Sequence, residues 1–376
     1  MKRAYNKGEW SEAYAFVKLL GDGRVYASDE NLNINYDKFY PILKVYKNEI
    51  ERYYETNTDE GIVNIVNSNG DVFCSLKTSE FADVAEKSVD IIRKGTKAKN
   101  VKKGQKGGTF EVPIMNDFLN KIGIEKIKSA NTGKTDIILE IWDETLRTKK
   151  KLNFSIKSFL GAEPSLMNAS QATNFTFKVD GMSDDEFMKL NDYKGKNWLK
   201  KKFGVIYKEY RAGNYDVTWI DERDNMLYQN LRLIDSNLPK IISDMLFYFY
   251  SHGKSGSITL LTEELIKSNP LNLADEEKAI FYKKKVTEYI EAVTFGLMPS
   301  KRWNDNNEIN GGLLTVRNDG KIVYHHILYD YDSLKNYLFK NTKLETGKTK
   351  RHKFGQLYKK ENGEIFFKLN LQLRYK

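Results

Sequence analysis

Residues 134–161, KTDIILEIWDETLRTKKKLNFSIKSFLG, restrict the fold more than any other stretch of this chain. Residues 135–142 and 151–159 have the composition of β-strands, and the polar stretch between them predicts a turn. The resulting hairpin places an acid, Asp136, and a lysine, Lys157, on neighbouring strands. Burying such polar groups costs free energy, so their presence on one hairpin favours a functional role.

Side chains alternate between the two faces of a strand, so Ser155 and Lys157 share a polar face while Ile156 points to the apolar one. An acid and a lysine in this arrangement resemble the core of the PD-(D/E)XK nuclease site. That motif usually has a second acid two residues before the lysine, where this chain has Ser155. The ordinary alternative is a surface hairpin with a salt bridge between Asp136 and Lys157.

Phosphodiester hydrolysis needs an in-line water and stabilisation of charge on the phosphate, which carboxylate-bound Mg²⁺ largely supplies. Because Mg²⁺ keeps several waters, one or two protein carboxylates suffice to bind it. Asp136 is the expected ligand, the main-chain carbonyl of Ile156 is a second one, and Lys157 would polarise the attacking water.

The missing second acid has three candidates. Glu12 lies in a helix predicted at residues 9–20, and Glu9 lies on nearly the same face of that helix. Glu163 follows Lys157 by six residues. For each of them, a solvated position without a catalytic role is the alternative.

The distribution of charge favours a polyanionic partner. The formal net charge of +10 is concentrated in three segments, residues 93–106, 194–202 and 343–376. Lys102 and Lys103 lie in the first, which carries seven Lys/Arg and no acid. Separate basic patches among aromatic residues fit contacts to the DNA backbone, although a lysine-rich proteome would produce the same net charge.

Composition also excludes several classes of protein. One cysteine, Cys74, rules out a disulfide within the chain and a cysteine-based zinc site. The N-terminus lacks the apolar stretch of a secretion signal, and the longest apolar run, residues 245–250, is too short to span a membrane. We therefore expect a soluble cytoplasmic protein.

The order of predicted elements is mixed α and β, and we expect an α+β fold with a central mixed sheet flanked by helices. Residues 1–180 would form the core that carries the hairpin, and residues 181–376 a helical and β-rich region for recognition and dimerisation, packed on the core. The elements expected besides those named above are strands at 24–27 and 42–46, helices at 79–94, 113–122, 239–251 and 275–297, and hairpins turning at 69–70, 318–320 and 362–363.

Three blocks of the sequence, residues 6–32, 153–177 and 352–375, resemble the HpaII family of type II restriction endonucleases. The pattern SIKSxxGxxxSLxNASxxTNF in the second block is long enough to be specific. The resemblance implies a PD-(D/E)XK nuclease fold, Mg²⁺ dependence and double-strand cleavage of a short, CCGG-like palindrome in double-stranded DNA. It implies 5′-phosphate and 3′-hydroxyl ends, and a companion DNA methyltransferase in the same restriction-modification system.

The resemblance carries the catalytic roles over to Asp136 and Lys157, with Ser155 in the place of an acid, and also to Glu12. A palindromic target is matched most simply by a two-fold homodimer with one active site for each strand. Guanine in such a target is read best by arginine or lysine in the major groove, so Arg351 is a candidate along with the basic segment at 93–106.

Asn168, Ser170, Thr173 and Asn174 follow the catalytic strand closely enough to contact the DNA backbone or a base edge. A network that only holds the loop together is an equally good interpretation of these residues. Two other functional classes remain open: a nuclease of the same fold that recognises DNA structure or modified bases, and a DNA-binding protein whose site is inactive because Ser155 replaces an acid.

Overall fold

The computed structural model describes residues 3–46, 52–95, 108–124, 133–253, 255–304, 308–327 and 329–376. The chain divides into two compact units. Unit 1 comprises Met1–Pro164 and Asn307–Tyr337, and unit 2 comprises Ser165–Asn306 and Leu338–Lys376. The expected mixture of helices and strands is confirmed. The functional division expected at residue 180 stays a prediction, and unit 1 also takes in a late segment of the chain.

Unit 1 is built on one sheet whose strand order is β1-β12-β11-β7-β6-β2-β3-β4-β5. Strand β1 also pairs with β2, which closes the first six strands of this order into a barrel. The sequence predicted a central mixed sheet flanked by helices, and it did not predict that this sheet closes into a barrel. The elements of unit 1 are α1 (Lys7–Asp22), β1 (Arg24–Ser28), β2 (Ile34–Tyr46), β3 (Arg52–Asn57), β4 (Ile62–Asn67), β5 (Val72–Lys77), α2 (Thr78–Lys94), α3 (Pro113–Lys121), β6 (Ile137–Asp143), β7 (Thr148–Ser158), β11 (Gly312–Val316) and β12 (Ile322–His326).

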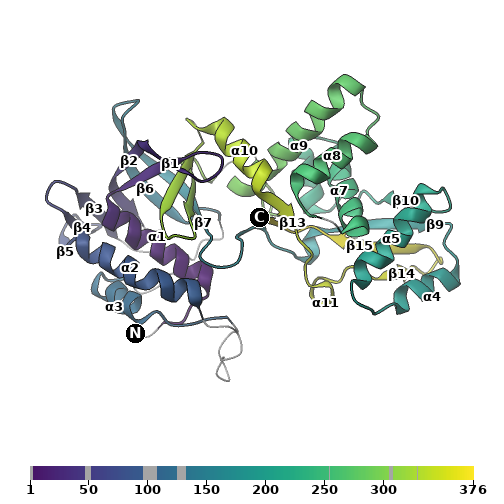
Figure 1. Ribbon diagram of the computed structural model, residues 1–376, viewed down its shortest axis with the longest axis horizontal. Helices are drawn as coiled ribbons and strands as arrows, with labels where there is room; N and C mark the ends of the chain where they lie inside the picture. The colour runs from purple at the N-terminus through teal and green to yellow at the C-terminus, as the bar shows by residue number, and fades with distance from the viewer. Residues whose placement is uncertain are drawn as a thin grey trace. The chain divides into compact units, whose positions relative to one another are not determined.

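Helix α1 confirms the helix predicted at 9–20 and extends it at both ends. The Asn6 side chain accepts the main-chain N–H of Glu9, and the Glu9 carboxylate accepts the N–H of Asn6, which forms a capping box. Gly23, at φ 62°, ends the helix in the left-handed region that favours glycine. The helix packs against α2 and β7, and Figure 1 shows α1 and α2 side by side.

The three hairpins predicted from Asn-Gly and Asp-Gly turns are confirmed. β4 pairs with β5, β11 with β12, and β14 (Leu357–Lys359) with β15 (Ile365–Asn370), in each case antiparallel. The second of these joins the barrel, because β11 pairs in parallel with β7. A late hairpin of the sequence therefore supports the strand that carries Lys157.

Unit 2 packs helices against the sheet β10-β9-β15-β14 and also holds the small sheet β13-β16-β8. Phe177 of β9 stacks on Phe367 of β15 with ring centroids 4.9 Å apart, and α7 packs against β15. The helix α10 (Tyr331–Asn341) runs from unit 1 into unit 2. The remaining elements are β8 (Ser165–Met167), η2 (Gln171–Thr173), β9 (Asn174–Asp180), α4 (Asp184–Asp192), α5 (Trp198–Arg211), β10 (Asp216–Trp219), α6 (Met226–Ile234), α7 (Leu238–His252), α8 (Ile258–Ser268), α9 (Asp275–Phe295), β13 (Thr342–Leu344), α11 (Thr349–His352) and β16 (Leu373–Tyr375).

Among the helices in the described ranges, none combines the length and the apolar character needed to cross a bilayer.

Candidate active site

The β6–β7 hairpin confirms the predicted pairing of the segments that carry the acid and the lysine. Ile137 pairs with Phe154, and Asp143 pairs with Thr148 at the turn. The main-chain N–H of Asp136 donates to the Phe154 carbonyl at 3.0 Å, which extends the pairing by one residue beyond β6. The ladder therefore holds the backbone of Asp136 in register with β7.

Asp136, Ser155 and Lys157 are joined in one chain of hydrogen bonds. The Ser155 hydroxyl donates to Asp136 Oδ2 at 3.0 Å, and the main-chain N–H of Ile156 donates to the same oxygen at 2.6 Å. Lys157 Nζ donates to Ser155 Oγ at 2.8 Å. The structure thus brings together the four residues predicted on this hairpin, and the serine connects the acid to the lysine.

Ser155 is fully buried at the position where the motif usually has an acid. A carboxylate there would lie beside Asp136, and two carboxylates that close together repel each other when both are ionised. The serine instead donates to one charged partner and accepts from the other. Its hydroxyl fixes the distance between Asp136 and Lys157 without adding a second negative charge.

The main-chain carbonyl of Ile156 points to the same side of β7 as Asp136. Asn153 and Phe159 bond towards β11, since the Asn153 carbonyl accepts from Gly311 and the Phe159 N–H donates to Val316. Backbone groups alternate in direction along a strand, so the N–H and the carbonyl of Ile156 point the other way. The N–H reaches Asp136 Oδ2, and the carbonyl is directed past the beginning of β6.

These oxygens fit a Mg²⁺ ion that keeps most of its waters. Within the described residues, no three His, Cys, Asp or Glu side chains gather into a metal site. Both hydrogen bonds that reach the Asp136 side chain from described residues end at Oδ2, so Oδ1 and the Ile156 carbonyl are the oxygen donors offered by the hairpin. Carboxylate and carbonyl oxygens are the ligands that Mg²⁺ prefers.

The three glutamates proposed as the second acid have different surroundings in the structure. The Glu9 carboxylate closes the capping box of α1 and is engaged there. Glu12 is half-buried on the same helix, which packs against β7. Glu163 is half-buried in the loop between β7 and β8. Glu12 takes no part in that capping box.

Two charged residues that the sequence did not single out, Lys134 and Glu308, also belong to this site. The pKa of Lys134 is lowered to about 8, mainly by burial and next by the positive charge of Lys157, while the negative charges of Asp136 and Glu308 act in the opposite direction. The main-chain N–H of Lys134 donates to Glu308 Oε2. The Glu308 carbonyl accepts from Asn153 Nδ2 at 3.0 Å and from the Thr135 hydroxyl at 3.3 Å.

Lys134 could have been identified from the sequence, because it lies two residues before Asp136 and such residues share a face in extended chain. Nothing in the sequence around Glu308 indicates that it belongs to the site. It lies 174 positions from Lys134 in the sequence and reaches the site because the segment before β11 runs along β7.

The predicted DNA contacts that follow β7 gather in one loop of unit 2. Asn370 Nδ2 lies within hydrogen-bond distance of the Ser170 carbonyl (2.7 Å), Thr173 Oγ1 (3.0 Å) and Asn174 Oδ1 (2.7 Å). Thr173 and Asn174 are buried, Ser170 is half-buried and Asn168 is exposed. The network holds the loop together and leaves Asn168 as the exposed member, and contact with DNA stays a prediction for all four.

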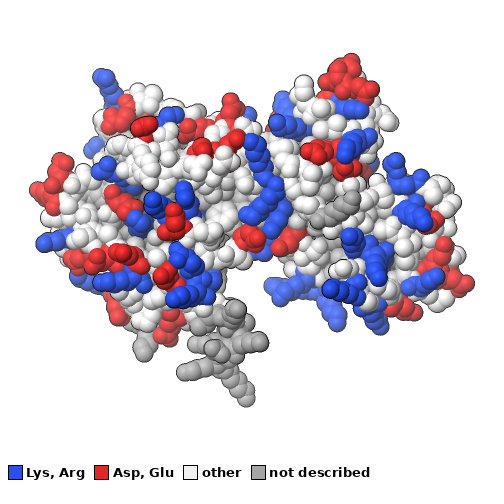
Figure 2. Space-filling model, viewed as in Figure 1, with Lys and Arg blue, Asp and Glu red and all other residues white. Residues whose placement is uncertain are grey.

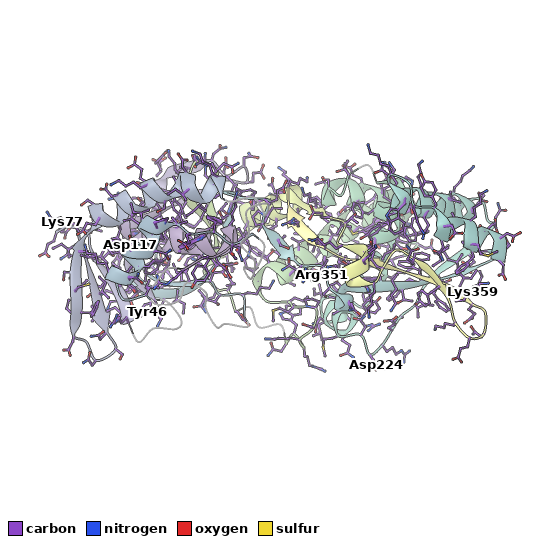
Figure 3. All side chains as sticks on the ribbon, turned by 90° about the horizontal axis from the view of Figure 1, so that it is seen from below. Tyr46, Lys77, Asp117, Asp224, Arg351 and Lys359 are labelled. Carbon is purple, nitrogen blue, oxygen red and sulfur yellow. The ribbon has the colours of Figure 1, made fainter. Side chains whose placement is uncertain are left out.

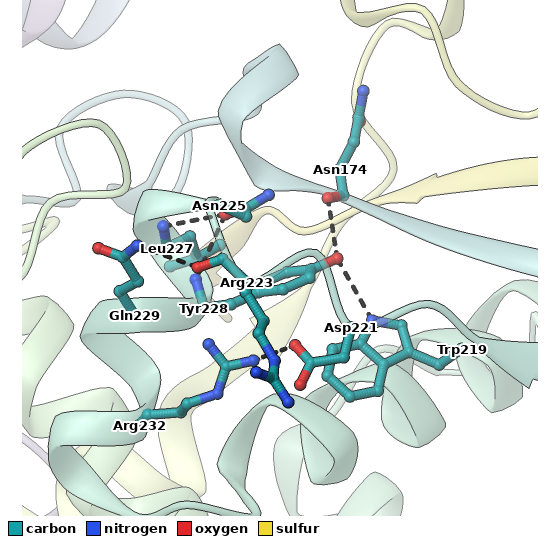
Figure 4. Close-up of polar contacts among 9 residues, drawn as sticks. All are labelled: Asn174, Trp219, Asp221, Arg223, Asn225, Leu227, Tyr228, Gln229 and Arg232. Atoms are coloured by element: carbon teal, nitrogen blue, oxygen red, sulfur yellow. Dashed lines mark hydrogen bonds and ion pairs between the residues drawn. The ribbon is translucent and has the colours of Figure 1, made fainter.

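Asn174 is held from a second side by α6 and the segment before it (Figure 4). The Tyr228 hydroxyl donates to the Asn174 carbonyl at 3.3 Å, and Trp219 Nε1 donates to the Tyr228 hydroxyl at 3.3 Å. Asn225 caps α6 by accepting the main-chain N–H of Leu227 at 3.0 Å. Asn174, at the beginning of β9, is therefore bonded by side chains from two parts of unit 2, Tyr228 of α6 and Asn370 of β15.

Arg351 is exposed on α11 (Figure 3), directly beside this loop. Asn174 Nδ2 donates to the His352 carbonyl at 2.9 Å, which joins the loop to α11. Figure 2 shows lysine and arginine side chains gathered around α11 and the nearby beginning of α5. We call the exposed side chains of Lys348, Lys350, Arg351 and Lys353 the α11 surface.

Buried Lys202 joins the basic segments at 194–202 and 343–376. Its ammonium donates to Asn191 Oδ1 at 2.9 Å, to Gln356 Oε1 at 2.8 Å and to the Gly355 carbonyl at 3.2 Å. The two segments are therefore adjacent in unit 2. The third basic segment contributes Lys102 and Lys103, which lie outside the described residues.

Comparison with known proteins gives two matches. The family model described as HpaII restriction endonuclease matches residues 6–375. The type II restriction enzyme HpaII of Haemophilus parainfluenzae is 33% identical over 373 residues, which cover 98% of this chain and 98% of that enzyme. No solved structure has a significant match to the chain.

Proposed function

Because the chain belongs to the HpaII restriction endonuclease family, we propose that it is a type II restriction endonuclease that makes Mg²⁺-dependent double-strand cuts at a short, CCGG-like palindrome. The observation that carries the proposal is the hydrogen-bonded chain from Asp136 through Ser155 to Lys157 on one hairpin. A mixed sheet with an acid and a lysine on adjacent strands supports a PD-(D/E)XK site.

In the proposed reaction, Asp136, the Ile156 carbonyl and Glu12 would hold Mg²⁺. The bound ion would neutralise charge on the phosphate and on the leaving oxygen. Lys157 holds the attacking water through its ammonium group, and Ser155 keeps that ammonium at a fixed distance from Asp136. In-line attack on phosphorus breaks the bond to the 3′ oxygen, leaving a 5′-phosphate and a 3′-hydroxyl.

DNA recognition would use the α11 surface together with the loop that carries Asn168. Contacts to phosphates would supply most of the affinity, and a contact from Arg351 to a guanine would supply specificity. A two-fold homodimer would present one active site to each strand of the palindrome. A companion methyltransferase would protect the DNA of the cell, whose cytoplasm is the expected location.

Digestion of unmethylated plasmid and phage DNA with Mg²⁺ tests this proposal. Asp136→Ala removes the carboxylate, and Glu144→Ala, in the exposed turn of the same hairpin, is the matched control. We expect discrete fragments with 5′-phosphate ends from the wild type and from Glu144→Ala, and no fragments from Asp136→Ala. DNA that is bound but left uncut by the wild type would favour an inactive binding protein. Cutting confined to branched or modified DNA would favour the structure- or modification-dependent nuclease.

A further inference from the structure

The α11 surface consists of four exposed cations on and beside a very short helix. Within the part of the chain that the structure describes, the side chains of Lys348, Lys350, Arg351 and Lys353 have neither an ion pair nor a hydrogen bond. Such cations are free to meet the phosphates and bases of DNA. Helix α11 spans only Thr349–His352, and a helix of one turn is not stable by its own hydrogen bonds. Its orientation therefore depends on what holds the chain at its ends.

The chain leaves α11 through a tightly packed segment. The Phe354 N–H donates to the Thr349 carbonyl at 3.3 Å, which turns the chain back against the helix. The Gly355 N–H then donates to the Lys368 carbonyl of β15 at 2.9 Å. Gly355 has φ 87°, and an added Cβ would lie 2.6 Å from Leu199 of α5. The segment that follows α11 is thus enclosed between β15 and the beginning of α5.

Lys202 of α5 fastens this segment from the interior. The residue is 1% exposed, and its ammonium donates to the Gly355 carbonyl, to Gln356 Oε1 and to Asn191 Oδ1. Asn191, at the end of α4, also accepts the Leu357 N–H at 3.0 Å and donates to the Leu357 carbonyl at 2.8 Å. One ammonium group therefore ties α4 and α5 to three consecutive residues that follow α11.

The partners of this ammonium are neutral. All three acceptors are amide oxygens, and among the described residues no carboxylate pairs with Lys202. Burying an ammonium group without an acid costs free energy, and a methionine at this position would avoid that cost. Burial lowers the pKa of Lys202 to about 8, so the group is still charged at neutral pH and uses its three N–H donors. A charge that is kept at a cost in stability favours a functional role.

We propose that Lys202 is a positioning residue for DNA recognition, which fixes the chain where it leaves α11 and thereby holds Arg351 where it reads a guanine of the target. This inference rests on the proposed function, because the target is the DNA to be cut. Lys202 acts through the backbone of Gly355 and makes no contact with DNA itself. The ordinary alternative is a lysine that only stabilises unit 2.

The first test compares Lys202→Met with Lys208→Met, which removes an exposed lysine from the same helix. Binding is measured without Mg²⁺ on a duplex with the cleavage site mapped for the wild type and on a duplex without it. We expect Lys202→Met to weaken binding of the first duplex about tenfold, as for partial loss of a guanine contact, and to affect the second much less. Lys208→Met should keep the wild-type ratio of the two affinities. An equal loss on both duplexes for Lys202→Met would overturn the proposal.

The second test is a double-mutant cycle with Arg351→Ala. If Lys202 acts through Arg351, adding Lys202→Met to Arg351→Ala should change the affinity for the site by less than about twofold. A tenfold loss that persists in the Arg351→Ala background would contradict the positioning role. A lysine that only stabilised unit 2 would lower the melting temperature without this coupling, so thermal unfolding is recorded for each variant.

Gln356→Ala keeps the test decisive if Lys202→Met does not fold. The Gln356 side chain is exposed, and its loss removes one acceptor of the ammonium while Lys202 stays in place. We expect a smaller loss of discrimination between the two duplexes, which again disappears in the Arg351→Ala background. Unchanged discrimination in folded Lys202→Met, or in Gln356→Ala where Lys202→Met is unfolded, overturns the inference alone. A wild type that does not discriminate between the duplexes overturns the proposed function first.

Discussion

Replacing Ser155 with alanine tests the link between Asp136 and Lys157 most directly. The substitution removes a bond of 3.0 Å to the carboxylate and one of 2.8 Å from the ammonium, with little change in volume. A hydrogen bond to a charged group contributes about 1.5–3 kcal/mol. If the reaction depends on one of the two bonds, kcat should fall about 10- to 150-fold, because each 1.4 kcal/mol of barrier is roughly tenfold in rate.

The assay is single-turnover cleavage of a duplex that contains the mapped site, with enzyme in excess over DNA. Ser158→Ala, three residues further along β7, is the matched control because the Ser158 hydroxyl accepts only a local N–H, that of Leu160, among the bonds described. We expect a slower rate for Ser155→Ala at nearly unchanged DNA affinity. Ser155→Ala within twofold of the wild type, together with an inactive Lys157→Ala, would refute the reasoning.

Three further predictions concern stability and DNA affinity. Burial raises the pKa of Asp143, but hydrogen bonds to the carboxylate lower it by more, so the net pKa is below its ordinary value. The unfolding free energy should therefore decrease as the pH is lowered below about 4 and the carboxylate is protonated. Asp143→Asn should flatten this fall in urea titrations. Arg351→Ala should weaken DNA binding by about 1–3 kcal/mol and relax specificity at the guanine that Arg351 is proposed to contact, and Lys359→Ala should do less because Lys359 is paired with an acid. Gly21→Ala should lower the unfolding free energy by about 1–3 kcal/mol, because its Cβ would lie 2.7 Å from the Ala82 nitrogen of α2.

Features set by neighbouring residues could be predicted from the sequence. The hairpins follow from Asn-Gly and Asp-Gly turns, and alternation along β7 was enough to place Ser155 and Lys157 on one face. The helix that carries Glu12 was found from its apolar periodicity. Its first residues were missed because the capping box of Asn6 and Glu9 extends the helix beyond the apolar pattern.

Features set by distant residues could not be predicted. Glu308 has no pattern around it that indicates the site, and the pairing of β1 with β2, which closes the barrel, depends on tertiary contacts. The loop from Asn168 to Asn174, for which contacts to DNA were predicted, illustrates the same limit. Its polar composition is equally typical of a DNA-binding surface and of a structural network, and only burial distinguishes the exposed Asn168 from Thr173.

The closed sheet explains how a serine can stand where the motif usually has an acid. Strand β7 has β6 on one side and β11 on the other, so the backbone that carries Ser155 and Lys157 is bonded on both sides. The hairpin is also pinned at its turn, where Asp143 accepts the main-chain N–H groups of residues 145 and 146 at 3.0 Å. A hydroxyl can align an acid and a lysine only if their backbones hardly move, since a single hydrogen bond is lost with a small displacement. The hydrogen-bonded strands of the barrel therefore help to hold Asp136 and Lys157 in place, which attraction to a second carboxylate would otherwise do. A variant that opens the barrel between β1 and β2 should slow cleavage, even though neither strand carries a catalytic residue.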